Sequence, residues 1–311
     1  YFGAECRTEE ETIAAARDAD GVVFSNAPLN AKVLKELKRC KFAVRHGIGM
    51  DNIDTKAATE LGMVVANVRD AFTEEVSNHG FSLLLACARK LFESDKIVRT
   101  SDWNNPETRK LWNGAVINPS PLRTETVGIL GFGRIGKSTA RKALAFRMNV
   151  LVTDPYIKAE DAAKEGCKLV DLKTLLKDSD YLVLNCPLSD ETRGILGEAE
   201  FKSMKKTAYL INISRGGVAD EAALVKALKE GWIAGAGLDV FSKEPIADDN
   251  PLKKLDSVIL TPHSGWYSRL SIKDLRATVI EQSCMILRGE WPSNLYNPEI
   301  KQKVDIKKLF G

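Results

Sequence analysis

The sequence predicts an α/β protein built from two doubly wound parallel-sheet domains. Three observations support this fold class. The chain has 311 residues, which is more than one average domain needs. Short apolar runs alternate with helical stretches along most of its length, as in parallel sheets covered by helices on both faces. A glycine-rich turn separates strand from helix near the middle of the chain.

The first 72 residues are expected to form small strand–helix units. Phe42 to Arg45 is apolar enough for a buried strand and runs directly into a loop that starts at His46. Two further strands and three helices are expected around it; the strands cover 21–25 and 63–66, and the helices cover 8–17, 30–38 and 54–60.

A long helix is predicted from Thr73 to Phe92. Thr73 is a suitable N-cap, and Glu74 and Glu75 place negative charge in the first turn, where the helix dipole favours it. The segment from Ser101 to Arg123 contains two tryptophans and three prolines with little periodicity, so we expect a loop-rich connection there.

The segment from Thr126 to Asp154 reads TVGILGFGRIGKSTARKALAFRMNVLVTD. It predicts a strand (126–130), a glycine turn, a helix to about residue 147, a second strand (150–153) and a closing acid. This is the dinucleotide-binding fingerprint in its required context. The glycines allow a tight turn, a close approach of the backbone to a pyrophosphate, and close packing of helix on strand; they are Gly131, Gly133 and Gly136.

Asp154 is placed to accept hydrogen bonds from the adenosine ribose hydroxyls. Its charge would also repel a 2′-phosphate, so the sequence favours NAD over NADP. The competing interpretation is a glycine turn with a purely structural role, which the flanking strands and the acid make less probable.

The remainder of the chain continues the alternation of strands and helices. Strands are expected at 181–185, 208–213, 235–240 and 258–260, and helices at 159–165, 172–177, 198–204, 221–230 and 268–287. Consecutive units of this kind form a doubly wound sheet that binds its ligand at the carboxyl ends of its strands. The last helix and the tail are expected to return to the first domain.

Composition excludes several classes of protein. The net charge is +3 with lysines and arginines spread along the chain, which is not the basic stripe of a nucleic-acid-binding protein. No apolar run reaches the length of a membrane span, and no signal-peptide pattern opens the chain. Six cysteines without CxxC pairing favour reduced thiols and a cytoplasmic location. The chain opens abruptly at Tyr1, so we expect it to lack its natural N-terminus.

Three residues at predicted strand ends are candidates for chemistry. His263 can donate and accept a proton near neutral pH, and a carboxylate such as Glu244 would raise its pKa. The guanidinium of Arg215 can bind a carboxylate with two hydrogen bonds. With a nicotinamide, these groups suit interconversion of a 2-keto acid and a 2-hydroxy acid. For any one of them alone, a surface or capping role is the simpler interpretation; their joint placement at sheet ends favours a site.

The chain resembles the D-isomer-specific 2-hydroxyacid dehydrogenase family, in its phosphoglycerate dehydrogenase and C-terminal binding protein branch, across nearly its whole length. The motifs that carry the resemblance are GFGRIG with Asp154, NISRGG (212–217), LDVFSKEP (238–245), TPHSGW (261–266) and GIGMDNID (47–54).

The resemblance implies that His263 is the acid/base, that Glu244 is its paired carboxylate, and that Arg215 binds the substrate carboxylate and carbonyl. It implies a Rossmann-type NAD domain (98–269) inserted into a discontinuous, flavodoxin-like substrate domain (1–97 and 270–311), and a homodimer held through the cofactor domain. The implied cofactor contacts, besides the three glycines, are Arg134, Ile135, Asp154, Cys186, Pro187, Thr192, Ile213, Arg215, Asp239 and His263.

The substrate pocket is expected at the loop formed by Gly47, Ile48 and Gly49, together with Arg215. Arg45 is either a second anchor for a carboxylate or phosphate, or a strand-end arginine in solvent. Trp266 either forms a wall of the pocket or packs between domains. His46 and His79 are interpreted as structural, and no metal site is predicted.

Two functions remain open from the sequence. The first is an NAD-dependent D-2-hydroxyacid dehydrogenase acting on a small acid. The alternative is an NAD(H)-sensing interaction protein of the C-terminal binding protein type, since that branch keeps the same three catalytic residues. Neither a nucleic acid nor a membrane is an expected partner.

Overall fold

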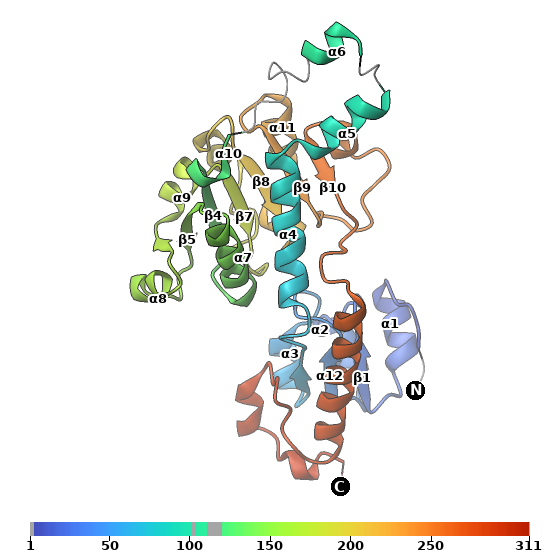
Figure 1. Ribbon diagram of the computed structural model, residues 1–311. Helices are drawn as coiled ribbons and strands as arrows, with labels where there is room; N and C mark the ends of the chain where they lie inside the picture. Colours follow the sequence, from blue (N-terminus) through green and yellow to red (C-terminus); the bar gives the residue numbers. More distant parts are fainter. Residues whose placement is uncertain (1–2, 101–103, 111–119, 311) are drawn as a thin grey trace. The chain divides into compact units, whose positions relative to one another are not determined.

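The computed structural model describes residues 3–100, 104–110 and 120–310 (Figure 1). Contacts divide the chain into two compact units. The first unit joins Tyr1–Phe72 to Ser268–Gly311, and the second comprises Thr73–Tyr267. The first unit is therefore built from both parts of the chain that flank the second. The division at Phe72 lies earlier than the boundary at residue 97 that we expected, because the helix starting at Thr73 packs on the second unit.

The first unit contains a parallel sheet of three described strands in the order β1-β2-β3. Each described strand pairs with the next one along the chain. The α/β class and the parallel pairing are confirmed. The strands are β1 (Gly21–Phe24), β2 (Phe42–Arg45) and β3 (Val64–Ala66), and the helices are α1 (Glu9–Ala16), α2 (Ala31–Glu36), α3 (Thr55–Glu60) and α12 (Arg269–Leu287).

The tail completes the first unit. After α12 come two short 3₁₀ helices, η5 (Pro298–Gln302) and η6 (Ile306–Lys308). The buried side chain of Asn297 accepts a hydrogen bond from the N–H of Val65 on β3 and donates to the carbonyl of Met63. The C-terminal segment is thereby fixed to the edge of this sheet, as the expected return of the tail requires.

The second unit contains a seven-stranded parallel sheet in the order β10-β9-β8-β7-β4-β5-β6. The order reverses between β4 and β7, so this sheet is doubly wound, as predicted, with the reversal beside the glycine turn. Its strands are β4 (Thr126–Leu130), β5 (Asn149–Thr153), β6 (Lys168–Leu169), β7 (Tyr181–Leu184), β8 (Tyr209–Asn212), β9 (Gly235–Leu238) and β10 (Val258–Leu260).

Helices cover this sheet on both faces (Figure 1). Helix α4 runs along β8 and β9 and packs against α7. Close approach depends on small residues: a Cβ on Gly237 would lie 3.0 Å from the Cβ of Leu83. The helices are α4 (Thr73–Ala88), α7 (Arg134–Ala145), α8 (Ala159–Lys164), α9 (Leu172–Asp178), α10 (Glu198–Ser203) and α11 (Glu221–Lys229), with 3₁₀ turns η2 (Leu122–Thr124), η3 (Gly216–Val218) and η4 (Pro251–Lys254).

The long helix predicted from Thr73 to Phe92 is interrupted. Helix α4 ends at Ala88, Lys90 adopts a left-handed φ of 53°, and a separate helix α5 (Leu91–Thr100) begins. The connection that follows contains the short helix α6 (Pro106–Lys110); residues 101–103 and 111–119 of the expected loop-rich segment lie outside the described residues. In Figure 1, α5 and α6 extend away from the sheet.

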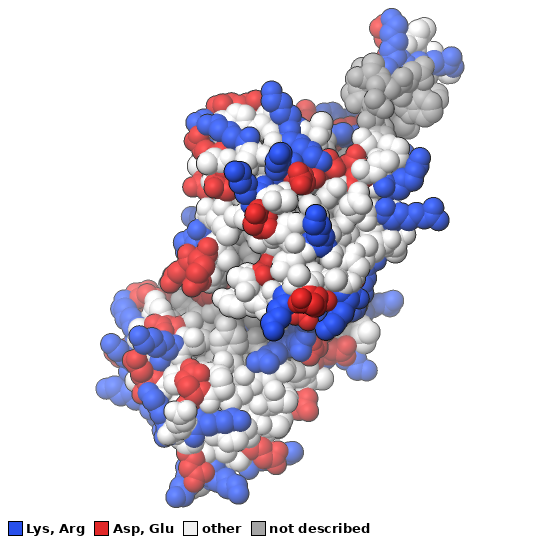
Figure 2. Space-filling view, turned by 90° about the vertical axis from the view of Figure 1, so that its left-hand side faces the viewer, with Lys and Arg blue, Asp and Glu red and all other residues white. Residues whose placement is uncertain are grey.

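The surface shows no large region of a single charge on the face visible in Figure 2, where acidic and basic side chains are interspersed. Within the described parts of the chain, no helix is both long enough and apolar enough to cross a lipid bilayer.

Candidate active site

The glycine turn after β4 has the geometry that the fingerprint predicts. Gly131 has a φ of 93°, and a Cβ there would lie 2.6 Å from the backbone nitrogen of Cys186. A Cβ on Gly136 would lie 2.2 Å from the carbonyl oxygen of Gly131. Any side chain at either position would therefore push α7 or β7 away from the turn.

Gly133 differs from its two neighbours because nothing lies within 4 Å of where its Cβ would be. It is the N-cap of the 12-residue helix α7 and supplies no side-chain cap, so the backbone at the start of this helix can be approached closely at Gly133. This cradle fits the pyrophosphate of a dinucleotide, which helix N-termini bind through unpaired N–H groups and the helix dipole.

Asp154 lies at the end of β5, next to the glycine turn. One of its carboxylate oxygens accepts a hydrogen bond from the N–H of Phe132 at 2.8 Å, and the other accepts from the N–H of Tyr156 at 2.9 Å. These bonds fix the carboxylate beside the turn, and each oxygen keeps a lone pair for a ribose hydroxyl. The position and the chemistry both fit the predicted role.

The other predicted cofactor residues lie around the same edge of the sheet. Thr192 closes the turn after β7 by donating to the carbonyl of Pro187 at 2.6 Å and accepting from the N–H of Ser189. Cys186 and Ile213 are buried at the ends of β7 and β8, and burial raises the pKa of the Cys186 thiol to about 11. Arg134 and Ile135 begin α7.

Arg215 follows β8 directly, in the turn before η3. Asn212 at the end of β8 shapes this turn: its side-chain NH₂ donates to the carbonyl of Arg215, and its side-chain oxygen accepts from the N–H of Ser214. Arg215 donates to the carbonyl of Ser214, and its charge is one of those that lower the pKa of Glu244. The guanidinium therefore acts on the acid–base pair described next.

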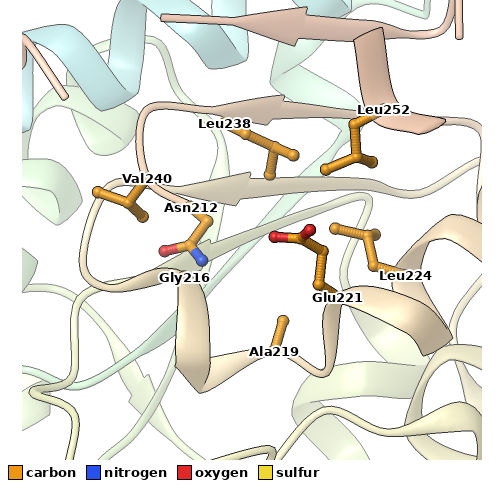
Figure 3. A pocket seen from close by; sticks show the side chains of 8 residues that line it. All are labelled: Asn212, Gly216, Ala219, Glu221, Leu224, Leu238, Val240 and Leu252. Atoms are coloured by element: carbon orange, nitrogen blue, oxygen red, sulfur yellow. The ribbon is translucent and has the colours of Figure 1, made fainter. Parts of the chain in front are cut away.

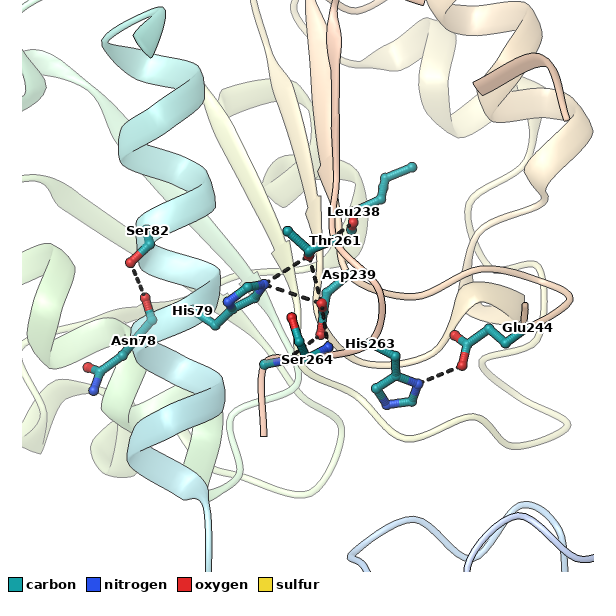
Figure 4. Close-up of polar contacts among 10 residues, drawn as sticks. Asn78, His79, Ser82, Leu238, Asp239, Glu244, Thr261, His263 and Ser264 are labelled. Atoms are coloured by element: carbon teal, nitrogen blue, oxygen red, sulfur yellow. Dashed lines mark hydrogen bonds and ion pairs between the residues drawn. The ribbon is translucent and has the colours of Figure 1, made fainter. Parts of the chain in front are cut away.

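His263 and Glu244 form a hydrogen-bonded pair (Figure 4). His263 Nδ1 lies 2.6 Å from Glu244 Oε2, and the two side chains are 39% and 35% exposed. Burial opposes ionisation of Glu244, but hydrogen bonds from His263 and the Phe241 N–H, with the charges of His263 and Arg215, outweigh it and lower its pKa. An ionised Glu244 orients the imidazole by accepting a hydrogen bond from its Nδ1.

A buried network fixes the turn that carries His263 (Figure 4). The carboxylate of Asp239 is 3% exposed and accepts hydrogen bonds from Thr261 Oγ1 and from the N–H groups of Ser264 and Gly265. His79 Nε2, from α4, lies 2.9 Å from Thr261 Oγ1 and 3.2 Å from Asp239 Oδ1. His263 itself has a φ of 52°, a left-handed conformation that is costly for a histidine and that the network maintains.

The resemblance implied a cofactor contact for Asp239, and this contact stays a prediction. Burial and hydrogen bonds to both of its oxygens direct Asp239 toward the His263 turn. The structural interpretation of His79 agrees with its bonds. No sequence pattern indicates its partner, because 182 residues separate it from Thr261.

The predicted substrate loop lies in the first unit. The carbonyls of Gly47, Ile48 and Gly49 each accept a hydrogen bond, from the Val68 N–H, the Asn67 amide and the Arg45 guanidinium respectively. Within the described residues, no acceptor is bonded to the N–H groups of these three residues.

Arg45 is 9% exposed, and it also donates to the carbonyl of Phe24 and lies over the Phe24 ring. It is not the solvated strand-end arginine that one of our two interpretations proposed, because the loop and β1 enclose it.

Trp266 packs edge-on against Tyr267, with ring centroids 5.5 Å apart, directly after Gly265, whose N–H donates to Asp239. Burial, with the charges of Arg45 and Arg276, lowers the pKa of His46.

Across residues 3–100, 104–110 and 120–310, no group of three or more histidine, cysteine or acidic side chains is arranged to hold a metal ion.

Comparison with known proteins identifies the family to which this chain belongs. Residues 81–265 match the family model described as "D-isomer specific 2-hydroxyacid dehydrogenase, NAD binding domain". The chain is 41% identical to a glyoxylate reductase of Korarchaeum cryptofilum over 93% of its length and 86% of that protein. It is 40% identical to a D-3-phosphoglycerate dehydrogenase of Methanocaldococcus jannaschii, covering 95% of this chain and 55% of that protein.

A solved structure with bound ligands has a similar fold. A D-lactate dehydrogenase from Aquifex aeolicus, complexed with NAD and lactic acid, superposes with a TM-score of 0.79 and 28% identity, covering 95% of this chain and 89% of that one. The chain belongs to the D-isomer-specific 2-hydroxyacid dehydrogenase family and is an NAD-dependent oxidoreductase that interconverts 2-keto acids and 2-hydroxy acids.

Proposed function

We propose that the protein reduces a small 2-keto acid such as glyoxylate to the 2-hydroxy acid, with His263 as the general acid. The observation that carries this proposal is the 2.6 Å contact between His263 Nδ1 and Glu244 Oε2 at the carboxyl end of a dinucleotide-binding sheet. The names of relatives supply the substrate class, since several are glyoxylate reductases.

The hydrogen bond to Glu244 determines which nitrogen of His263 can transfer a proton to the substrate. Glu244 occupies Nδ1, so Nε2 remains on the opposite side of the ring to donate a proton to the carbonyl oxygen of the substrate. Since the pKa of Glu244 is lowered, its carboxylate stays ionised and holds the imidazole in one orientation through Nδ1.

Arg215 and the 47–49 loop supply the remaining polar groups. Arg215 would bind the substrate carboxylate and polarise the carbonyl. The three N–H groups of Gly47, Ile48 and Gly49 form a set of donors suited to a carboxylate, because the carbonyls of the same residues are all bonded within the first unit. Arg45 supports this loop from beneath, and we propose that Trp266 forms a wall that limits the substrate side chain.

The cofactor supplies the hydride when bound. The residues that would hold it are the N-terminus of α7 for the pyrophosphate and Asp154 for the adenosine ribose. We assign Asp239 to positioning the His263 turn, and we keep Cys186, Pro187, Thr192 and Ile213 as the remaining cofactor contacts.

We further propose a homodimer that forms through the cofactor-binding unit. No residue of α5 is buried, although three of its side chains are large and apolar. These are Leu91, Phe92 and Val98, which are 53%, 61% and 52% exposed. Clustered exposed apolar side chains on a helix are typical of a subunit contact. We also propose a cytoplasmic location, which the six free cysteines and the need for an NAD pool support.

The experiment that tests the function is a substrate screen. The protein is mixed with NADH and, one at a time, with glyoxylate, hydroxypyruvate, phosphohydroxypyruvate, pyruvate, phenylpyruvate or 4-methylthio-2-oxobutyrate, and absorbance of NADH is followed. We expect consumption with the smallest acids and slower consumption with NADPH. Tight NADH binding without consumption of any acid would contradict the proposal and favour the NAD(H)-sensing alternative, which the names of the relatives do not favour.

A further inference from the structure

The loop that carries Glu244 is anchored at both ends by a carboxylate that belongs to neither the cofactor site nor the acid–base pair. We define the Glu244 loop as residues 241–250, which follow β9. Glu221 Oε2 accepts a hydrogen bond from the N–H of Ser242 at 2.9 Å, and Glu221 Oε1 accepts from the side-chain amide of Asn250 at 2.8 Å. One side chain thus connects the start and the end of the loop.

The position of Glu221 explains how it reaches both ends. It is the first residue of α11, and its side chain points into a small pocket between α11 and the ends of β8 and β9 (Figure 3). The pocket is lined by Asn212, Gly216, Ala219, Glu221, Leu224, Leu238, Val240 and Leu252. Because most of these side chains are apolar, the carboxylate is directed to its two polar partners on the loop.

Two adjacent N–H groups of the loop are divided between two carboxylates. The N–H of Phe241 donates to Glu244 Oε1 at 3.0 Å, and the next N–H, that of Ser242, donates to Glu221. The other oxygen of Glu244 contacts His263. A rotation of the 241–242 backbone would therefore break the Glu221 bond and displace the acid–base pair together.

The same backbone is packed against the turn that carries Arg215. A Cβ on Gly216 would lie 1.9 Å from the carbonyl carbon of Phe241 and 2.3 Å from the nitrogen of Ser242. Steric contact sets the separation of the two turns, but it does not fix how the loop is oriented. The two hydrogen bonds of Glu221 supply that orientation.

We propose that Glu221, together with Asn250, is a positioning residue that holds the Glu244 loop and thereby sets the geometry of the Glu244–His263 pair. The effect on turnover rests on the proposed function, whereas the effect on the loop does not. Misplacement of a catalytic group by about 1 Å can lower turnover by about 100-fold. We therefore expect Glu221→Ala to lower kcat by about 10- to 100-fold while NADH binding is unchanged.

Glu221→Gln is the conservative variant. The Asn250 amide cannot rotate to suit a glutamine, because its Oδ1 already accepts from the N–H of Leu252 and caps η4. A glutamine can keep the Ser242 bond and loses the Asn250 bond, so we expect a loss of kcat between those of the wild type and Glu221→Ala.

Asp220→Ala is the matched control. Asp220 is the N-cap of α11 and accepts from the N–H of Ala223, but it makes no bond to the loop. It therefore weakens the same helix terminus without releasing residues 241–250. If Glu221 acted only by stabilising α11, the two alanine variants would have the same effect on kcat.

The test combines kinetics with hydrogen exchange. We expect faster amide exchange across 241–250 in Glu221→Ala but not in Asp220→Ala, whether or not a substrate has been found. We also expect Glu221→Ala to cause no further loss of kcat in a Glu244→Ala background, since both act on one pair.

Unchanged exchange in the loop of Glu221→Ala would overturn the proposal, as would an equal loss of kcat in both backgrounds or an equal loss in Asp220→Ala. Absence of turnover in the wild type would instead refute the proposed function, and the exchange result would still decide the anchoring role.

Discussion

Three carboxylate side chains have different roles in this site because their surroundings differ. Glu244 is half-buried and shares its carboxylate between the Phe241 N–H and His263, so it can respond to a proton on the imidazole. Asp239 is almost fully buried and bonded on both oxygens, so it holds the backbone. Asp154 lies beside the glycine turn and keeps lone pairs for a ligand.

Asp239→Asn tests the holding role. Burial opposes ionisation of Asp239, but hydrogen bonds from His79, Thr261 and the N–H groups of Gly265 and Ser264 outweigh it and lower its pKa. An asparagine cannot accept both backbone bonds, so we expect the free energy of unfolding at pH 7 to fall by about 1–3 kcal/mol.

The same variant gives a pH dependence of known sign. A carboxylate with a lowered folded-state pKa stabilises the protein above its unfolded-state pKa, and this stabilisation is lost as the pH falls through the folded-state pKa. The difference in unfolding free energy between the wild type and Asp239→Asn, from urea titrations, should therefore shrink at acidic pH. A difference that is constant with pH would contradict the assignment.

Asp154→Ala tests cofactor choice. Loss of the carboxylate removes the acceptor for the ribose and the repulsion of a 2′-phosphate, so NADH should bind at least about 10-fold more weakly and the preference over NADPH should fall. Fluorescence titration with both cofactors measures this, with Asp161→Ala on α8 as a control for loss of a nearby surface charge. An unchanged NADH/NADPH ratio would show that other residues set the preference.

At the scale of elements, α4 supports the second unit by contacting both the sheet and α7. The buried hydroxyls of Ser77 and Ser138 are 3.0 Å apart, and Lys142 on α7 donates to both of them and to Glu74. His79 on the same helix reaches the Asp239 network. The cofactor-binding helix and the turn that carries His263 are thus both braced by α4.

Helix α5 carries the prediction on assembly. Replacing Leu91 and Phe92 together by serine should convert the dimer to monomers, because it removes apolar surface that the described part of the chain leaves exposed. Light scattering after size-exclusion chromatography measures the mass, and Ile280→Ser, at a position that is 63% exposed on α12, is the control. If the serine variant keeps the mass of the wild type, whether dimeric or monomeric, α5 is not the contact.

At the scale of the whole molecule, the sequence predicts the elements better than their partners. Strands β2, β4 and β10 have the predicted bounds, because each is an apolar run with clear stop signals. The end of α4 was missed because Ala88-Arg89-Lys90-Leu91 contains neither glycine nor proline, and β6 is too short to show a period. The resemblance supplied the His263–Glu244 pair, but no sequence pattern shows which way Asp239, His79 or Glu221 points.

The most direct test of the account is turnover and NADH binding of His263→Ala, measured on the same preparation. Removal of the imidazole should lower kcat by at least about 100-fold, which is the usual contribution of a positioned acid. The NADH affinity of the variant, measured by fluorescence titration, should equal that of the wild type. Near-normal turnover in this variant would contradict the assignment of His263 as the proton donor.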